Sequence, residues 1–295
     1  MIDEVINKLE NSKSENYFEY TVLTGDTLNA KALNDLQATT NVLSEFYDVP
    51  SCVFVKNGNV FATALGKETN DAYLKAFDCD PLSTFSACVG FSATVDAETA
   101  KHLQSYSIPM VIAPDFEDSA VDILTRNNET ILIKLNSSLK DYKTFAQELF
   151  GITPFGLVKN EVKNNLELNK NTFKVATKTK PATEQIEDAI FAWKISKYLA
   201  PINVLVAKDF KTLSIFQAQA NTQSAVEYAL NFACDSSKNA IICLSEDFLT
   251  ESILNAVAQA RIGLIIYSGG EIQDLKIINS ADKLNISILT TGIKI

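Results

Sequence analysis

The chain has 295 residues, and its 36 acidic and 26 basic side chains give a formal net charge of −10 with the single histidine neutral. Apolar residues make up 46% and charged residues 21%, a balance that excludes a disordered chain and leaves room for two globular domains. The negative charge disfavours non-specific binding to nucleic acid, because phosphates would be repelled over most of the surface.

In the first half, apolar periodicity and turn residues predict alternating helices and strands. In chain order we expect helix 2–9, strand 21–23, helix 32–46, paired strands 52–55 and 60–65, helix 71–77, strand 87–91, helix 96–103, strand 109–113, helix 118–124 and strand 131–135. The dipeptide Asn57-Gly58 is a strong signal for a two-residue hairpin turn, and Asp96 is the expected N-cap of its helix.

The second half follows the same order. We expect a helix opened by Thr183 and running to Leu199, paired strands 204–206 and 213–216, helix 224–232, strand 240–244, helix 249–260, strand 262–267, helix 275–284 and strand 286–289. Residues 151–182 are rich in asparagine and lysine, and we interpret them as an irregular polar connector whose last part alternates like a strand.

Corresponding residues of the two halves lie at a near-constant distance along the chain. Lys56 and Lys208 close corresponding strands (208 − 56 = 152), and Val111 and Leu264 lie in corresponding later strands (264 − 111 = 153). This offset indicates an internal duplication. We therefore expect an α/β protein with a three-layer αβα architecture, in which two tandem subdomains, 1–160 and 161–295, each contain a mixed sheet. The second subdomain would begin with a strand from about residue 172, and a cleft between the halves would hold a small-molecule ligand.

Few residues carry recognisable chemistry. His102 has no Cys, Ser or second His beside it, and no cluster with metal-ligand spacing occurs, so we expect no metal site. With only two arginines, Arg126 and Arg261, anion binding would depend on lysines, backbone N–H groups or helix N-termini. For Arg261 we favour a structural role as a cation at a helix C-terminus.

The expected compartment is the cytoplasm. The five cysteines are scattered, form no Cys-x-x-Cys pair and mostly have apolar or small neighbours. The first residues lack the layout of a signal peptide, and no apolar run approaches the ~20 residues that a membrane span needs. We expect association with neither a membrane nor nucleic acid.

Several segments resemble a known family. Residues 53–66 read VFVKNGNVFATALG, 80–85 read DPLSTF, 95–101 read VDAETAK, 111–114 read VIAP, 173–178 read FKVATK, 190–194 read IFAWK and 206–209 read VAKD. These segments resemble the AICAR transformylase half of the bifunctional purine-biosynthesis enzymes that formylate AICAR and close the ring to IMP. The resemblance covers most of residues 20–295 and includes no cyclohydrolase half. It implies two cytidine-deaminase-like subdomains and a homodimer with sites at subunit boundaries.

The resemblance also implies site residues. The family's catalytic Lys-His pair falls on Lys56 and Asn57, so the lysine is kept and the histidine is replaced by an amide that cannot act as a base. Where the family has an asparagine this chain has Ile202, and where the family has an arginine it has Thr222. The substrate-binding positions that it implies are Asn59, Ser83, Phe85, Gln219 and Lys294. From the residues alone, Lys56 could equally be a solvated hairpin residue, and Phe85 is favoured as a core residue over a folate-stacking one.

Three functional interpretations follow. The favoured one is a transformylase-family protein that has lost formyl transfer and binds a ligand or a protein partner. The alternative is an active, divergent AICAR formyltransferase that uses 10-formyltetrahydrofolate. The third is an enzyme with different chemistry in the same cleft, for which the sequence offers no nucleophile–base pair.

Overall fold

The protein is described by a computed structural model that covers residues 18–25, 28–126, 130–145, 148–153, 156–161, 172–269 and 274–295. The helix predicted over residues 2–9 lies outside these described residues. The first lobe contains β1 (Tyr20–Thr24), α2 (Ala30–Leu43), β2 (Ser51–Lys56), β3 (Asn59–Leu65), α3 (Thr69–Phe77), β4 (Cys88–Phe91), α4 (Ala97–Gln104), β5 (Met110–Ala113), α5 (Asp118–Leu124), β6 (Ile131–Leu135) and α6 (Leu139–Phe145).

A β-hairpin, β7 (Glu148–Thr153) and β8 (Gly156–Glu161), follows the first lobe as a separate two-stranded sheet. The second lobe contains β9 (Lys174–Val175), α7 (Thr183–Ser196), β10 (Val204–Lys208), β11 (Lys211–Phe216), α8 (Thr222–Ala233), η2 (Cys234–Ser237), β12 (Ile241–Leu244), α9 (Glu251–Gln259), β13 (Leu264–Tyr267), α10 (Asp274–Lys283) and β14 (Ser287–Thr290).

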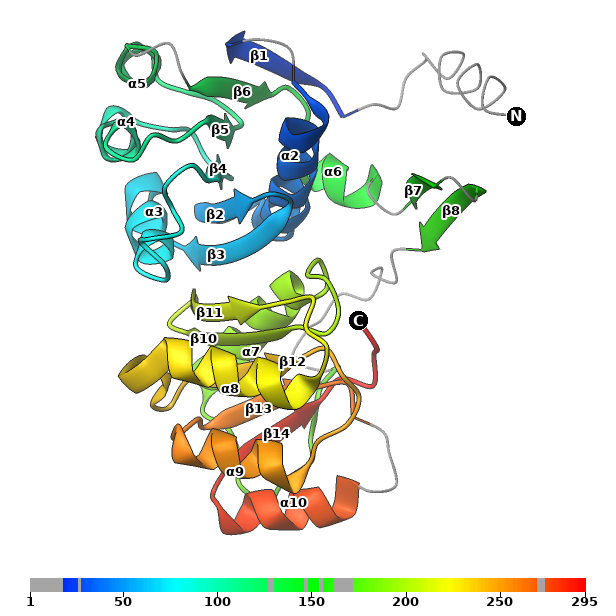
Figure 1. The fold of residues 1–295 in the computed structure, drawn as a ribbon. Helices are drawn as coiled ribbons and strands as arrows, with labels where there is room; N and C mark the ends of the chain where they lie inside the picture. The colour runs from blue at the N-terminus through cyan, green and yellow to red at the C-terminus, as the bar shows by residue number, and fades with distance from the viewer. Residues whose placement is uncertain are drawn as a thin grey trace.

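The two lobes share one twelve-stranded sheet with the order β1-β6-β5-β4-β2-β3-β11-β10-β12-β13-β14-β9. Each lobe contributes a hairpin, three parallel strands and an antiparallel edge strand, so the second lobe repeats the first in reverse order across the sheet (Figure 1). The expected three-layer α/β architecture with mixed sheets and tandem duplication is confirmed. The division at residues 160/161 stays a proposal.

Helices cover both faces of the sheet. On one face, α2 and α7 belong to a single hydrophobic cluster that spans both lobes and includes Leu43, Val53, Trp193 and Leu205. On the other face, α3, α4 and α5 form the core of the first lobe, and α8, α9 and α10 form that of the second. The lobes are therefore joined by a common core on one face and keep separate cores on the other.

The boundary between the lobes is formed by β3 and β11. Leu65 donates its N–H to the Phe210 carbonyl at 2.9 Å, and the Thr212 hydroxyl both accepts from the Thr63 N–H at 2.9 Å and donates to the Thr63 carbonyl at 3.1 Å. Next to this junction, the buried Glu45 accepts hydrogen bonds from Lys197 and from Tyr198. Backbone pairing and buried side chains thus occupy the boundary at which the sequence predicted a ligand cleft.

Local structure agrees with the sequence at most elements. The Asp96 carboxylate caps α4 by accepting the Thr99 N–H at 2.7 Å, as predicted. The prediction of an irregular connector over residues 151–182 is wrong at 151–153 and 156–161, which pair as β7 and β8. The asparagines and lysines that follow gave this stretch a polar composition, and composition alone does not exclude a two-stranded hairpin. In the described part of the chain, no helix combines the length and the apolar composition that a membrane crossing requires.

Candidate functional site

The first candidate position is the turn between β2 and β3. Asn57 has a φ of 54° and Gly58 a φ of 77°, the left-handed pair that a type I′ hairpin turn requires. The Gly58 N–H donates to Oδ1 of Asp35, a buried residue of α2, at 2.5 Å. The hairpin tip that follows Lys56 is therefore fixed to the helix that precedes it.

The Lys56 ammonium is bound by backbone oxygens of the loop before β4. It donates to the Phe85 carbonyl at 2.8 Å and to the Ser83 carbonyl at 3.3 Å. The Asp80 side chain fixes this loop by accepting the Ser83 N–H at 3.0 Å, and the Thr84 hydroxyl donates to the Asp80 carbonyl at 3.1 Å. The structure thus brings together three of the predicted residues, Lys56, Ser83 and Phe85.

The remaining first-lobe candidates lie at the surface of the same region. The Asn59 amide donates to the Asn57 carbonyl at 3.3 Å, which places both residues on the hairpin tip. The Phe85 side chain is 58% exposed, so the interpretation of Phe85 as a core residue is wrong. Asn57 also lines a cavity of about 580 Å³ together with Lys31, Asn34 and other residues of α2.

Gln219, from the second lobe, lies close to this hairpin. Its side-chain amide donates to the Gln217 carbonyl at 2.9 Å, and its N–H donates to the Ile202 carbonyl at 3.2 Å. The Gln217 side chain in turn donates to the Val60 carbonyl of β3 at 2.8 Å. Two hydrogen bonds therefore connect Gln219 to the strand that begins at Asn59.

Lys294 lies at the same end of the strands as Lys56 but several strands away from it. It forms an exposed ion pair with Asp247, which follows β12. In the sheet, β12 is four strands away from β2, which corresponds to roughly 19 Å at the usual spacing of strands. The structure therefore does not bring Lys294 together with Lys56.

The titratable groups offer little acid–base chemistry at this site. His102 is on α4, where its ring stacks on Tyr73 of α3 with a centroid distance of 5.9 Å. Burial raises the pKa of Cys88 to about 12, so this thiol stays protonated at neutral pH. Over the residues that the structure describes, no group of three or more His, Cys, Asp or Glu side chains is placed to hold a metal ion.

Sequence reasoning missed two polar residues that hold this region together. Asp35 fixes the first hairpin, and Asp188 fixes the second by accepting the N–H groups of Asp209 and Phe210 at 3.0 and 2.8 Å. The two aspartates obey the repeat offset (188 − 35 = 153), so applying the offset to polar residues would have found them. Gln217 was also missed, and no local signal in the sequence indicates its contact with β3.

Comparison with known proteins gives three results. The model of the family described as "AICARFT/IMPCHase bienzyme" matches residues 5–232. Two proteins named "Bifunctional purine biosynthesis protein PurH", from Caldicellulosiruptor bescii and from Thermoanaerobacter sp. (strain X514), are 32% and 33% identical to the chain and match 96% and 92% of it. The matches cover 54% and 52% of those proteins, so the chain spans about half the length of these curated relatives.

A solved structure of Acinetobacter baumannii RibD (form 2) is 10% identical, and the match covers 90% of this chain and 75% of that one. Its TM-score of 0.29 is too low to support an argument about the site.

Proposed function

The chain belongs to the AICARFT/IMPCHase bienzyme family, and from this premise we propose that it is a member of this purine-biosynthesis lineage that has lost formyl transfer and serves to bind a ligand or a protein partner. The observation that carries the proposal is how the Lys56 ammonium is bound and which residue follows it. Its ammonium donates to two backbone carbonyls, and the neighbouring Asn57 has no group that can accept a proton near pH 7. The pair therefore supplies a structural cation and no general base.

The size of the expected loss supports an inactive centre. A general base contributes about 10²–10⁴ in rate, and one oxyanion donor about 10²–10³. The resemblance places the first at Asn57 and a second polar group at Ile202, whose side chain forms no hydrogen bonds. Even with strong non-additivity, losing both costs at least ~10³ in rate.

A second candidate function is an active, divergent AICAR formyltransferase that uses 10-formyltetrahydrofolate. It is favoured by one observation: the side chain of Phe85, whose backbone carbonyl binds the retained Lys56, is exposed. An exposed aromatic ring can stack on a planar ligand such as a pterin. In this alternative, Lys56 would have to leave the Ser83 and Phe85 carbonyls when substrate binds.

The deciding experiment is a formylation assay on the full chain with AICAR and 10-formyltetrahydrofolate, run beside a PurH relative as positive control. We expect no product above the enzyme-free blank. Turnover that disappears in the Lys56→Ala variant would reject the proposal and support the second candidate. The variant matters because it separates activity of this site from that of a contaminating enzyme.

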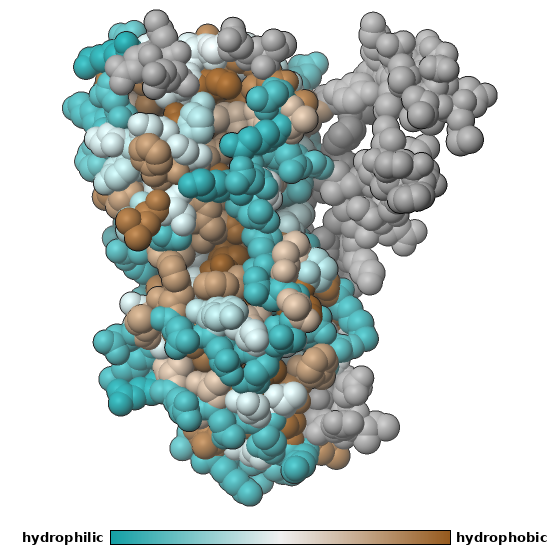
Figure 2. Space-filling model, viewed as in Figure 1, coloured by the Kyte–Doolittle hydropathy of each residue, from teal (hydrophilic) through white to brown (hydrophobic). Residues whose placement is uncertain are grey.

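We also propose that the protein forms a homodimer, as the resemblance implies. Leu82 is 91% exposed and Phe85 58% exposed in the loop that binds Lys56, and a partner subunit at this loop would remove both apolar side chains from water. Figure 2 shows apolar side chains at the surface of the upper lobe just above its junction with the lower one. Light scattering during gel filtration tests this proposal. A dimer that becomes monomeric in Leu82→Asp is expected, and a wild-type monomer would contradict it.

A further inference from the structure

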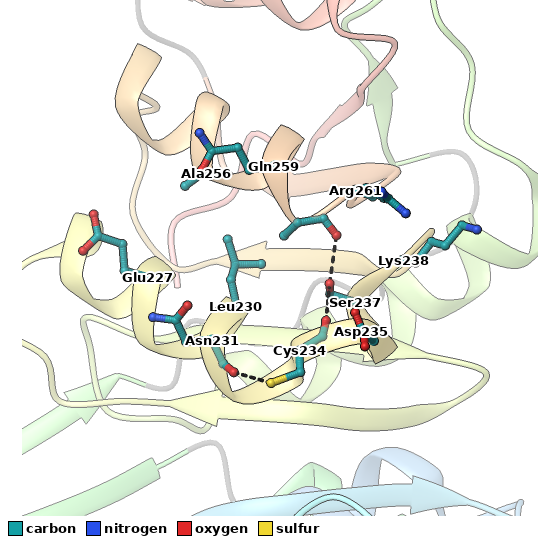
Figure 3. Close-up of a pocket in the computed structure, with 11 residues that line it drawn as sticks. Glu227, Leu230, Asn231, Cys234, Asp235, Ser237, Lys238, Ala256, Gln259 and Arg261 are labelled. Carbon is teal, nitrogen blue, oxygen red and sulfur yellow. Dashed lines mark hydrogen bonds between the residues drawn. The ribbon is translucent and has the colours of Figure 1, made fainter.

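A groove of about 770 Å³ lies in the second lobe, between α8, η2 and α9 (Figure 3). Its lining residues are Glu227, Leu230, Asn231, Cys234, Asp235, Ser237, Lys238, Ala256, Gln259, Ala260 and Arg261. This volume is within the range of pockets that bind small molecules, about 300–1,000 Å³. The groove is unrelated to the residues that the sequence indicated as a site.

The groove has two different ends. Figure 3 shows the Glu227 carboxylate at one end and the Lys238 and Arg261 side chains, with Asp235 beside them, at the other. Between them lie the apolar side chains of Leu230 and Ala256, from α8 and α9. An elongated ligand in this groove would meet two cations at one end and an apolar surface in the middle.

Hydrogen bonds hold the two cationic loops side by side. The Asn239 N–H donates to the Arg261 carbonyl at 2.9 Å, and the Ser237 hydroxyl donates to the Ala260 carbonyl at 2.8 Å. Lys208 donates to the Lys238 carbonyl at 3.1 Å, which ties the same loop to the second hairpin. The backbone positions from which Lys238 and Arg261 extend are therefore fixed relative to each other, so a ligand would order only their side chains.

Arg261 directly follows the C-cap Ala260 of α9, where a cation is favourable, and its guanidinium is available to a ligand as well. The Ser237 hydroxyl lies 2.8 Å from the Ala260 carbonyl at the end of α9 and 2.7 Å from the Cys234 carbonyl, so its one proton is shared between them. Within the described parts of the chain, the ion pairs of the protein involve neither Lys238 nor Arg261. Asp235 also lines this end of the groove, so the two cations outnumber the acidic side chains there by one and leave a local positive charge in a chain of net charge −10.

We propose that this groove binds a phosphate monoester, with the phosphate between Lys238 and Arg261 and the body of the ligand over Leu230 and Ala256. Two cations match the dianionic phosphate, and the planar guanidinium presents paired N–H donors that fit phosphate oxygens. Glu227 at the far end disfavours a second anionic group and accepts hydrogen bonds from hydroxyl or amino groups. A mononucleotide has this distribution of charge.

The groove lies apart from the Lys56 hairpin, on which the proposed loss of formyl transfer rests. Lys208, which contacts the cationic loop, pairs with Lys211 at the end of the sheet where β11 meets Ala64 of β3. Lys56 pairs with Asn59 at the other end of β3. Binding in the groove therefore leaves the first hairpin unoccupied, and loss of one site does not imply loss of the other.

The test is calorimetric titration of the full chain with AMP as the probe and adenosine as the uncharged comparison. We expect saturable AMP binding, at least ~10-fold weaker binding of adenosine, and at least ~10-fold weaker AMP binding by the double variant Lys238→Gln/Arg261→Gln. The matched control is Lys101→Gln/Arg126→Gln, which removes the same charge from the first lobe and should bind AMP like the wild type. Unfolding midpoints of both double variants verify that they fold.

Cys234 provides a second measurement, because it is the exposed cysteine of the chain and lines the groove. AMP should slow the alkylation of Cys234 by a maleimide in the wild type and not in the Lys238→Gln/Arg261→Gln variant. Three results would overturn the proposal: no saturable AMP binding up to about 10 mM, equal AMP affinity in the folded double variant, or unchanged labelling of Cys234 at saturating AMP.

Discussion

Lys56 and Lys208 make the same contact in the two lobes. Each closes the first strand of a hairpin, and each donates its ammonium to a backbone carbonyl of the loop that precedes the next strand of the sheet: Lys56 to Phe85 at 2.8 Å and Lys208 to Lys238 at 3.1 Å. The accepting residues follow the lysines at nearly the same separation, 29 and 30 residues. Nothing in the family resemblance gives Lys208 a catalytic role, so the shared contact indicates that the duplicated fold itself uses these lysines.

The first prediction follows from this equivalence. Lys56→Met and Lys208→Met should each lower the free energy of unfolding by about 1 kcal/mol, because each removes a charged donor from a loop carbonyl. Urea unfolding measures the change, and Lys101→Met, on the exposed surface of α4, is the control expected to stay within ~0.5 kcal/mol. If Lys208→Met destabilises the protein and Lys56→Met does not, the contact with the loop carbonyls does not explain why a lysine occupies position 56.

The second prediction concerns the pH dependence of stability through Asp188. Burial raises the pKa of Asp188 above its ordinary value and outweighs the opposing effect of the hydrogen bonds from Phe210 and Asp209. The folded state therefore binds the proton more tightly than the unfolded state. The contribution of Asp188 to stability then decreases as the pH rises from the unfolded-state pKa through the folded-state pKa. The free energy of unfolding of the wild type, relative to that of Asp188→Asn, should therefore fall as the pH rises above the ordinary pKa of an aspartate, about 4.

Asp71 supplies the control with the opposite sign. Its pKa is lowered, first by the side-chain hydrogen bond from Lys75 and then by the backbone N–H of Lys67. The unfolded state therefore binds the proton more tightly, and the contribution of Asp71 is lost as the pH falls. In urea titrations across the acidic range, the differences for Asp188→Asn and Asp71→Asn should change in opposite directions. Parallel changes would contradict the assignment of burial as the cause at Asp188.

The parts of the fold that the sequence predicted depend on local chemistry. Asn57-Gly58 adopts positive φ because asparagine and glycine tolerate it, and the prediction of a hairpin there is confirmed. The second hairpin is also confirmed, although its turn residues Asp209 and Phe210 have φ values of 54° and 55° and phenylalanine is uncommon there. In that turn, the two N–H groups bound by Asp188 support the conformation.

Contacts between residues far apart in the chain were not predictable. The pairing of β3 with β11 depends on Thr63 and Thr212, which are 149 residues apart and carry no motif. The contact of Lys56 was not predictable for the same reason. The hairpin pattern places Lys56 at the end of a strand, but it does not show whether the ammonium faces solvent or binds the carbonyls of a loop 27 to 29 residues further along the chain. The environment of the ammonium depends on the conformation of residues 83–85, which the hairpin pattern does not determine.

The third prediction concerns the junction of the lobes. Glu45 is buried and binds Lys197, whose side chain is 8% exposed, and the Tyr198 hydroxyl at 2.8 Å. Glu45→Ala should lower the free energy of unfolding by about 3–5 kcal/mol, because it leaves a buried ammonium without its carboxylate. The matched control is Asp78→Asn, which breaks a second pair between the lobes, Lys211–Asp78 at 2.6 Å, where Asp78 is 69% exposed. This control should lower the free energy of unfolding by less than about 1 kcal/mol. Equal decreases in the two variants would show that burial does not determine how much an ion pair stabilises the junction.

The last prediction tests whether one substitution accounts for the proposed loss of formyl transfer. Histidine is among the residues that tolerate a φ of 54°, so Asn57→His should fold with wild-type stability and place an imidazole beside Lys56. If the missing base were the whole defect, the variant would gain about 10²–10⁴ in rate. We expect no formylated product, because the Lys56 ammonium still donates to Ser83 and Phe85 and Ile202 supplies no polar side chain.

The assay uses AICAR and 10-formyltetrahydrofolate, with Asn57→Gln as the control that changes size without adding a base. Product formed by the histidine variant and not by the glutamine variant would mean that the remaining site is intact. The protein would then be a transformylase that lacks a single group, since an imidazole increases the rate only where the other groups already position substrate and formyl donor.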